Sequence, residues 1–291
     1  VSVAVDKNNQ IHAVWTGQSN FYYSSAPAWR ADSAHAWSKP VVVATNSARH
    51  LRDCSIATDL SGDVHILYAT RGDEVGVYHI RSQDNGQSWQ TAVKLSSPLG
   101  VLETGLTNVQ ITADVLGHLY AVWQTLQKEG FGQAIYYARS TDGGVNWTSP
   151  DQLAYRAPGS YETSWPYLAS IGESELHLIY VGGPWHIGRY HRISTDGGET
   201  WSEPQHIITD MEGVNGYVTP IVDGAGDMHL ISNMRTRTQE GGMFYARWLG
   251  TGWSPVEFAA RQSETLGAAH YTAATVRLGN ELHLVWNNLT G

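Results

Sequence analysis

The chain has 291 residues and a formal net charge of −9, with 18 Lys and Arg residues against 27 Asp and Glu residues. This balance offers no basic surface for a phosphate backbone, so we expect no nucleic-acid partner. No apolar run reaches the ~20 residues of a membrane span, and the single cysteine excludes an internal disulfide. Cys54 lies in an apolar strand pattern, which predicts a buried and inert thiol.

One short strand pattern recurs along the chain. It begins with an aliphatic residue, usually continues with His, and then alternates apolar residues that mostly end on an aromatic ring. The six copies are Ile11–Trp15, Val64–Tyr68, Leu119–Trp123, Leu176–Tyr180, Met228–Ser232 and Leu282–Trp286. Each copy follows an apolar strand and a polar turn, and an aromatic third strand and a short fourth strand come after it.

Four antiparallel strands in about 50 residues are the unit of a propeller blade. We therefore predict an all-β fold, a single six-bladed β-propeller over residues 1–291. The predicted blades are 1–47, 48–98, 99–155, 156–209, 210–260 and 261–291. The sixth blade is incomplete because little sequence follows Trp286, and an open two-stranded blade would expose a sheet edge. We expect the chain to belong to a longer polypeptide.

The repeated strand carries a His in most copies, namely His12, His65, His177, His229 and His283, with Tyr120 in the third. Equivalent positions in a ring of blades lie around its circumference and do not converge on one ion. We therefore expect these side chains to pack between blades. No group of His, Asp and Glu has the sequence spacing of metal ligands, so we predict no metal and no other cofactor.

Three predicted turns share the pattern Ser-x-Asp-x-Gly-x-x-Trp. Their residues are Ser82, Asp84, Gly86 and Trp89; Ser140, Asp142, Gly144 and Trp147; and Ser194, Asp196, Gly198 and Trp201. Degenerate copies stand at Ala36-Trp37 and Gly252-Trp253. The Asp can accept backbone N–H groups, the Gly takes a positive-φ corner and the Trp folds back on the sheet. We predict a structural role for these aspartates.

This pattern is the Asp box, or BNR repeat, and the chain resembles the sialidase superfamily over essentially its full length. In that family the boxes lie at the periphery, on the face opposite the active site. The resemblance implies a site where the loops between blades and those joining second to third strands converge. Sialidases bind a substrate carboxylate there with three arginines, and they use an Asp acid/base with a Tyr nucleophile assisted by Glu.

The resemblance places Arg52 at the start of the second blade and Arg71 and Asp73 at the exit of its second strand. Asp73 would be the acid/base and Arg71 an auxiliary cation, although a solvated Arg-Gly-Asp loop explains them equally well. Arg235, with Arg237 beside it, leaves the equivalent strand of the fifth blade as a second carboxylate-binding candidate. Arg261 or Arg156 would supply a third cation.

Two departures from the family pattern weaken a catalytic reading. Thr219 precedes Pro220 where the family has Glu, and Val1 already opens the strand at which the nucleophile is expected. Other candidates for the nucleophile are Tyr271, Tyr217, and Tyr161 beside Glu162. A structural role as a loop anchor explains each of them equally well. The predicted catalytic set is therefore incomplete.

Aromatic residues in the same predicted loops favour carbohydrate recognition, because rings stack on the apolar faces of sugars. They are Tyr161, Trp165, Trp185, Tyr217 and Tyr271. We predict a secreted or cell-surface protein that recognises a glycan or another extracellular ligand without turnover. The alternatives are an exo-sialidase-type glycoside hydrolase that releases terminal acidic sugars, and a structural module of a larger extracellular assembly.

Overall fold

In the computed structural model of this protein, the described residues are 1–45, 53–71, 74–96, 99–160, 162–183, 188–209, 211–212, 218–236, 241–261, 268–277 and 281–289. Their regular structure is almost all β-strand, with two short 3₁₀ turns, η1 (Ala28–Arg30) and η2 (Ala34–Ala36). None of the described helices is long and apolar enough to cross a membrane. The chain forms two compact units, residues 1–155 and 156–291.

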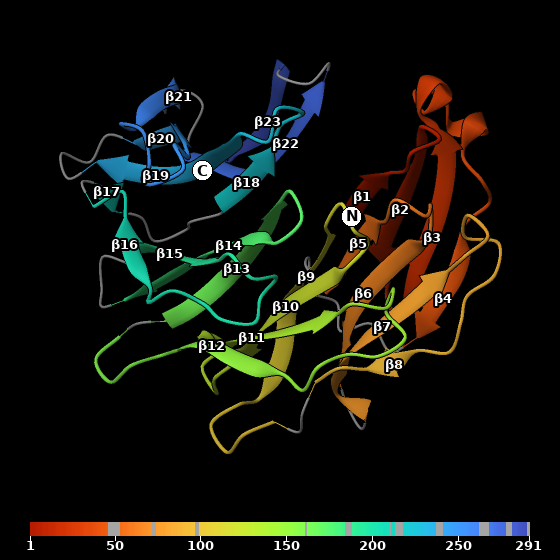
Figure 1. Cartoon of the computed structure of the whole chain (residues 1–291), viewed down its shortest axis with the longest axis horizontal. Coiled ribbons are helices and arrows are strands. Elements are labelled where there is room, and N and C mark those ends of the chain that lie inside the picture. The colour runs from red at the N-terminus through yellow and green to blue at the C-terminus, as the bar shows by residue number, and fades with distance from the viewer. Residues whose placement is uncertain are drawn as a thin grey trace. The chain divides into compact units, whose positions relative to one another are not determined.

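The first unit contains three antiparallel sheets of four strands each, with the strands paired in chain order (Figure 1). The first sheet consists of β1 (Ser2–Val5), β2 (Gln10–Thr16), β3 (Asn20–Pro27) and β4 (Val41–Thr45). The second consists of β5 (Cys54–Thr58), β6 (Val64–Thr70), β7 (Gly76–Ser82) and β8 (Val93–Lys94). The third consists of β9 (Gly105–Ala113), β10 (Leu119–Leu126), β11 (Gly132–Ser140) and β12 (Asp151–Tyr155).

The second unit continues the same arrangement. Its first sheet is β13 (Glu162–Ile171), β14 (Glu175–Gly183), β15 (Gly188–Ser194) and β16 (Gln205–Ile207). The next combines β17 (Met211–Glu212) and β18 (Val218–Val222), both paired with β19 (Met228–Thr236), and continues with β20 (Gly241–Arg247) and β21 (Glu257–Arg261). The described part of the last sheet is β22 (Ala268–Arg277) and β23 (Glu281–Leu289).

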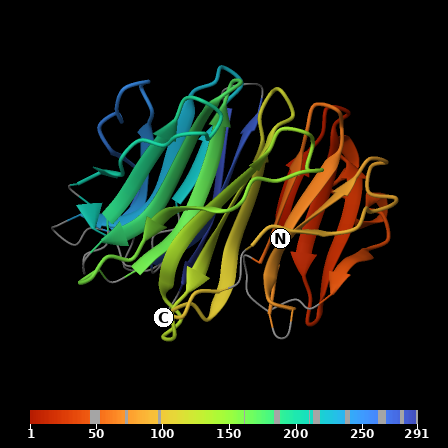
Figure 2. The ribbon, with the colours of Figure 1, turned by 60° about the horizontal axis from the view of Figure 1, so that its bottom comes forward.

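The prediction of an all-β chain built from repeated antiparallel sheets is confirmed, and the last sheet is two-stranded over the described residues. Within each unit, the first strands of successive sheets lie side by side: β1, β5 and β9 in one, and β13, β18 and β22 in the other (Figure 2). Closure of the six sheets into one ring remains a prediction.

Apolar side chains between successive sheets form the core. Strand β6 is buried along its whole length because sheets cover both of its faces. Leu67, Leu106 and Trp123 pack together between the second and third sheets. Each such side chain contributes about 1.5–3 kcal/mol by leaving water. Cys54 is buried in the neighbouring cluster, and burial raises the pKa of its thiol to about 12, as expected for an inert cysteine.

The three Ser-x-Asp-x-Gly-x-x-Trp segments form hairpins after β7, β11 and β15, and all three have the same hydrogen bonds. The Ser hydroxyl donates to the Asp at 2.7–2.8 Å and accepts the Gly N–H at 2.8–2.9 Å. The Asp also accepts the N–H four residues further on at 2.8–2.9 Å. Hydrogen bonds from Ser88 and Thr200 lower the pKa of Asp84 and Asp196, respectively, to about 2.

The glycine of each hairpin in the first unit receives a ring from the preceding sheet. Gly86 and Gly144 have φ values of +81° and +85°. A Cβ atom would lie 2.2 Å from the Tyr23 ring at Gly86 and 2.3 Å from the His79 ring at Gly144. Tyr23 and His79 also meet the edges of the hairpin tryptophans, at ring-centroid distances of 5.0 and 5.1 Å. The glycine is therefore required by both backbone conformation and space.

The two degenerate copies of the motif differ from these hairpins. In the first sheet, η1 and η2 take the place of the tight turn, and the Trp37 indole donates to Ala31 O at 3.0 Å. In the fifth sheet, Trp253 still meets the third strand of the preceding sheet, because its indole donates to His191 Nδ1 at 3.3 Å. The tryptophan contact thus persists where the Asp is missing.

We predict that Gly144→Ala destabilises the protein more than Gly130→Ala. Both glycines have a φ of +85°, but a Cβ atom at Gly130 meets nothing within 4 Å. The backbone change alone should cost about 1–2 kcal/mol. The clash with His79 should add a further ~1–3 kcal/mol in Gly144→Ala. Urea unfolding of both variants measures the difference, and equal losses would contradict the packing argument.

Candidate functional site

The site was predicted where the second strand of a sheet ends and the third begins, here called the strand-exit end of the sheet. Several of the predicted site residues lie outside the described residues: Arg52, Asp73, Tyr161, Trp185, Tyr217 and Arg237. Backbone alone places Arg235 in β19, Arg261 in β21 and Tyr271 in β22. Their convergence on one ligand therefore stays a prediction. Arg156 donates to Ser160 O at 2.8 Å.

Arg71 directly follows β6 at the strand-exit end of the second sheet. Its Nε and Nη2 atoms are buried, and no hydrogen-bond partner for either is present among the described residues. These two nitrogens form one edge of the planar guanidinium, the edge that pairs bidentately with a carboxylate or phosphate. A buried donor without an acceptor costs about 1–3 kcal/mol, and more for a charged group. Pairing of this edge with an anion would offset that cost.

Other polar groups are buried at the same end of the first unit. Asp53 is fully buried and accepts a hydrogen bond of 2.8 Å from Thr107 Oγ1, which ties β9 to the start of β5. Asn108 donates to Gln124 Oε1 at 2.7 Å, and both side chains are buried. Polar pairs of this kind fix side-chain positions because each buried group needs its partner.

The first strands bulge at matching places near this end. The register between β9 and β10 shifts next to Asn108, which has a φ of +50°. In the second unit, the register between β13 and β14 shifts at Trp165, whose φ is +55°. Strand β22 has a further shift at Tyr271. A bulky residue at positive φ is strained, and bulges are common beside binding sites, where they redirect a side chain.

In the second unit, the strand-exit end contains an arginine that sequence reasoning missed. Arg189 is fully buried, and it donates from Nε to Ser232 Oγ at 3.3 Å and from Nη2 to Asn233 O at 3.2 Å. Its Nη1 is also buried and has no partner within the described part of the chain. Burial lowers the pKa of Arg189 to about 10, and the nearby charge of Glu162 opposes this shift.

The sequence did contain a signal for Arg189. In the third strand of the other sheets, the residue two positions before the repeated Tyr or His is apolar: Phe21, Val77, Ile135 and Met243. Arg189 occupies this position in the fourth repeat. A charged residue in an otherwise apolar row marks a position with a special role.

A hydrogen-bonded relay crosses the sheets at the opposite end, here called the turn end. It joins a carboxylate near the first turn, a second-strand His and a third-strand Tyr or His. The relays are Asp59–His65–His79, Glu175–His177–His191 and Asp223–His229–Tyr245, and the third repeat has Asp114–Tyr120. In the first repeat His12 bonds to Tyr23, and Asp6 Oδ2 lies 3.5 Å from His12 Nε2, an ion-pair distance rather than a hydrogen bond. The His side chains thus bond within their own sheet, rather than simply packing between blades as predicted. The third-strand ring stands two residues before the register partner of the His, so both side chains lie on the same face of the sheet.

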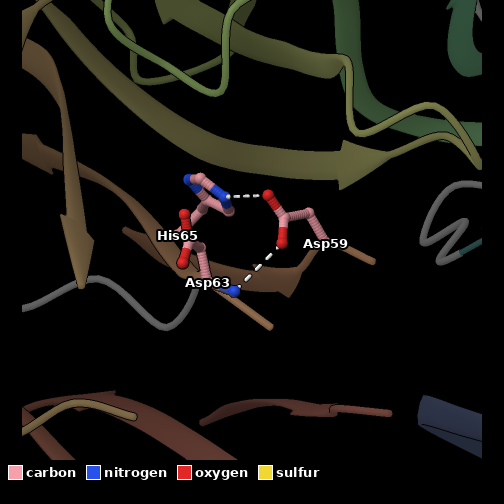
Figure 3. A group of neighbouring side chains, drawn as sticks. All are labelled: Asp59, Asp63 and His65. Atoms are coloured by element: carbon pink, nitrogen blue, oxygen red, sulfur yellow. Dashed lines mark hydrogen bonds and ion pairs between the residues drawn. The ribbon is translucent and has the colours of Figure 1, made fainter. Parts of the chain in front are cut away.

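The relay of the second repeat belongs to a group that sequence spacing did not reveal. Ligand atoms of Asp59, Asp63 and His65 lie within 4.8 Å of one another (Figure 3). Each residue already has a protein partner: Asp63 accepts from Arg81 Nε at 2.8 Å, Asp59 accepts two backbone N–H groups, and His65 bonds to His79. The positive guanidinium beside Asp63 opposes a bound cation. These contacts favour a hydrogen-bonded turn over a metal site.

Repeated antiparallel sheets, three of which have a Ser-x-Asp-x-Gly-x-x-Trp hairpin between their third and fourth strands, define an all-β repeat protein with the fold of the sialidase superfamily. A family model described as "BNR repeat-like domain" matches residues 117–267, and the chain belongs to this family. The resemblance inferred from the sequence is thereby confirmed. A search of curated proteins gives no match.

Solved structures with similar folds include two enzymes named for sialic acid chemistry and one lyase. The Hadza microbial sialidase Hz136 has a TM-score of 0.65 and 13% identity, with 99% of this chain and 62% of that chain covered. The polysaccharide lyase PL25 ulvan lyase has a TM-score of 0.64 and 14% identity, with coverages of 94% and 73%. The leech intramolecular trans-sialidase has a TM-score of 0.63 and 12% identity, with coverages of 99% and 64%. At these identities the likeness shows the fold alone, and this chain spans less than two thirds of both sialic acid enzymes.

We predict that His79→Tyr reduces the sensitivity of the protein to acid. Burial lowers the pKa of His79 to about 3, so the folded state keeps this ring neutral, whereas the unfolded ring has its ordinary value of 6.5. Stability from this group is present above pH 6.5 and is lost as the pH falls, by about 2 kcal/mol between pH 6.5 and 5. Tyrosine suits the position because Tyr23 and Tyr245 occupy it in other relays.

Urea unfolding at pH 7.5 and pH 5 measures this effect in the wild type, in His79→Tyr and in the exposed control His35→Tyr. The wild type and the control should lose the same stability on acidification, and His79→Tyr should lose less. An unchanged loss in His79→Tyr would refute the role of the buried ring.

Proposed function

We propose that this protein recognises glycans carrying an acidic group, at the strand-exit end and without cleaving them. One observation carries the proposal: the buried Nε and Nη2 of Arg71 have no hydrogen-bond partner among the described residues. A carboxylate or sulfate of a glycan supplies two acceptor oxygens to that edge. The acidic group would thus relieve the unpaired donors of Arg71 on binding.

Aromatic and polar residues around the strand-exit end supply the remaining contacts in this proposal. Trp165 is half-buried on its bulge. In this proposal its ring stacks on a sugar face, as do the rings of Tyr161, Trp185, Tyr217 and Tyr271. Glu162 is buried at the start of β13 and would accept from hydroxyl groups. Arg52, Arg235 and Arg237 are proposed as further cations. The ligand is extracellular in this proposal, and the protein is secreted or displayed at a cell surface.

An exo-sialidase-type hydrolase is the alternative function, with Asp73 as its acid/base. The names of two similar structures, a sialidase and a trans-sialidase, support it. Thr219 stands where the family resemblance requires the Glu partner of the nucleophile. Because this Glu is missing, we propose recognition ahead of turnover. A structural role in a larger extracellular assembly is the third candidate.

We predict that Arg71→Gln weakens binding of an acidic glycan by about tenfold or more, since one charge-assisted pair contributes about 1.5–3 kcal/mol. Titration calorimetry with 3′-sialyllactose, an ulvan oligosaccharide and neutral lactose measures it. Arg30→Gln is the matched control, because Arg30 is exposed in η1 at the turn end. If neither acidic glycan binds, or if Arg71→Gln binds as tightly as the wild type, the proposal fails.

Turnover separates recognition from the alternative function. We expect no release of fluorophore from a 4-methylumbelliferyl sialoside by the purified chain. Hydrolysis that Asp73→Asn abolishes would replace recognition by the exo-sialidase reading.

A further inference from the structure

A pocket of about 430 Å³ opens at the turn end of the second unit, away from the strand-exit end. It is bordered by the turn between β13 and β14, the turn between β18 and β19, and the end of β20. Its volume lies within the roughly 300–1,000 Å³ of small-molecule sites. Two departures from the repeat pattern meet in this pocket, and departures from a repeated pattern often mark functional positions.

The first departure concerns the carboxylate of the fourth relay. In the first, second, third and fifth repeats an Asp stands six residues before the second-strand His or Tyr, and its side chain is at most 5% exposed. Ile171 occupies that position in the fourth repeat. Glu175 bonds to His177 Nε2 at 2.7 Å instead, and its side chain is 39% exposed. The sixth repeat resembles the fourth, because Glu281 stands two residues before His283 and lies 3.5 Å from its Nε2. The fourth relay therefore presents a fixed carboxylate and an apolar Ile171 wall to the pocket.

The second departure concerns the hairpin of the fifth sheet. Trp248 stands three residues after the relay Tyr245, where the full motif has Ser, and the hairpin is two residues shorter than its neighbours. The Trp248 indole packs edge-on against His177 and His191, with ring centroids 5.5 and 5.1 Å away. Trp248 and the exposed Leu249 thereby form another wall of the pocket.

Charged groups at the pocket supply both acceptors and donors. Arg247 Nη1 lies 3.6 Å from Asp227 Oδ2, a loose pair whose side chains are half exposed. With Glu175, the pocket has two carboxylates and one guanidinium, a net charge of −1 that disfavours an anion. Each sugar hydroxyl both donates and accepts a hydrogen bond, which suits this mixture, and Ile171 and Leu249 suit the C–H faces of a pyranose ring.

From this combination we propose a second binding site for a neutral pyranose unit at the turn end of the second unit. The site is separate from Arg71 and does not require the function proposed above. Its residues come from two adjacent sheets of one unit. The relay holds Glu175 in place, so the position of this acceptor is set before the ligand arrives.

The test is saturation-transfer NMR of the full chain with the methyl glycosides of glucose, galactose, mannose and N-acetylglucosamine. At least one glycoside should bind with millimolar affinity. Arg247→Gln removes the donor, and Leu249→Trp fills the pocket from an exposed position; each should weaken binding at least about tenfold. Arg139→Gln is the matched control, because Arg139 holds the same position in the third repeat, and Arg71→Gln is the control for the other site. Both controls should bind as the wild type does.

Absence of binding by all four glycosides, or unchanged affinity in Arg247→Gln, would overturn the proposal. Thermal unfolding identifies any variant that fails to fold, and Arg247→Gln then decides the outcome if Leu249→Trp is unstable. Loss of neutral-sugar binding in Arg71→Gln would place the ligand at the strand-exit end and would also refute the turn-end site. The acidic-glycan proposal is tested with other ligands and by Arg71→Gln, so its failure does not change how these neutral-sugar results are interpreted.

Discussion

The third-strand ring at the end of the relays is the constraint on which the rest of the structure depends. A carboxylate fixes the second-strand imidazole, and the imidazole fixes a Tyr or His of the third strand. In the first unit that ring lies against the glycine and tryptophan of the next hairpin, where there is no room for a Cβ atom. One interaction thus sets strand register, hairpin conformation and the spacing of neighbouring sheets. Burial also lowers the pKa of His79 and His191 to about 3, so the interaction depends on neutral rings.

Polar side chains are hydrogen-bonded to different extents at the two ends of the sheets. At the turn end, aspartates of the hairpins accept several hydrogen bonds each, and these contacts stabilise the fold. At the strand-exit end, nitrogen atoms of Arg71 and Arg189 are buried and have no partner within the described residues. Trp165 adds a strained backbone there. Unpaired donors and strain reduce stability, and the recognition proposed for this end gives a reason for them.

Much of the fold was predictable because it repeats. The period of the second-strand pattern and the three Asp boxes predicted the sheets, their four-strand order and the family. The relays were not predictable, because Asp59, His65 and His79 meet only when the register of three strands is known. The grouping of Asp59, Asp63 and His65 was missed for the same reason, since a turn brings them together. Arg189 was visible in the sequence as a charge in an apolar row, but only once the repeats are aligned by their relay residues. The arginine site proposed by resemblance rests mainly on residues outside the described ranges, so family likeness remains its chief support.

The contact between a relay ring and the following hairpin has a direction. In the first unit the first and second sheets each offer a ring to the sheet after them, and the later sheet supplies the glycine that receives it. A gene segment that encodes one sheet therefore encodes the glycine for the junction with the preceding sheet and the ring for the junction with the following sheet. Copies of such a segment fit together head to tail without any new complementarity, which explains how a long array can arise by duplication. The same property lets individual copies diverge, as the fourth and fifth have at Ile171 and Trp248, while Trp253 still contacts His191 between these two sheets.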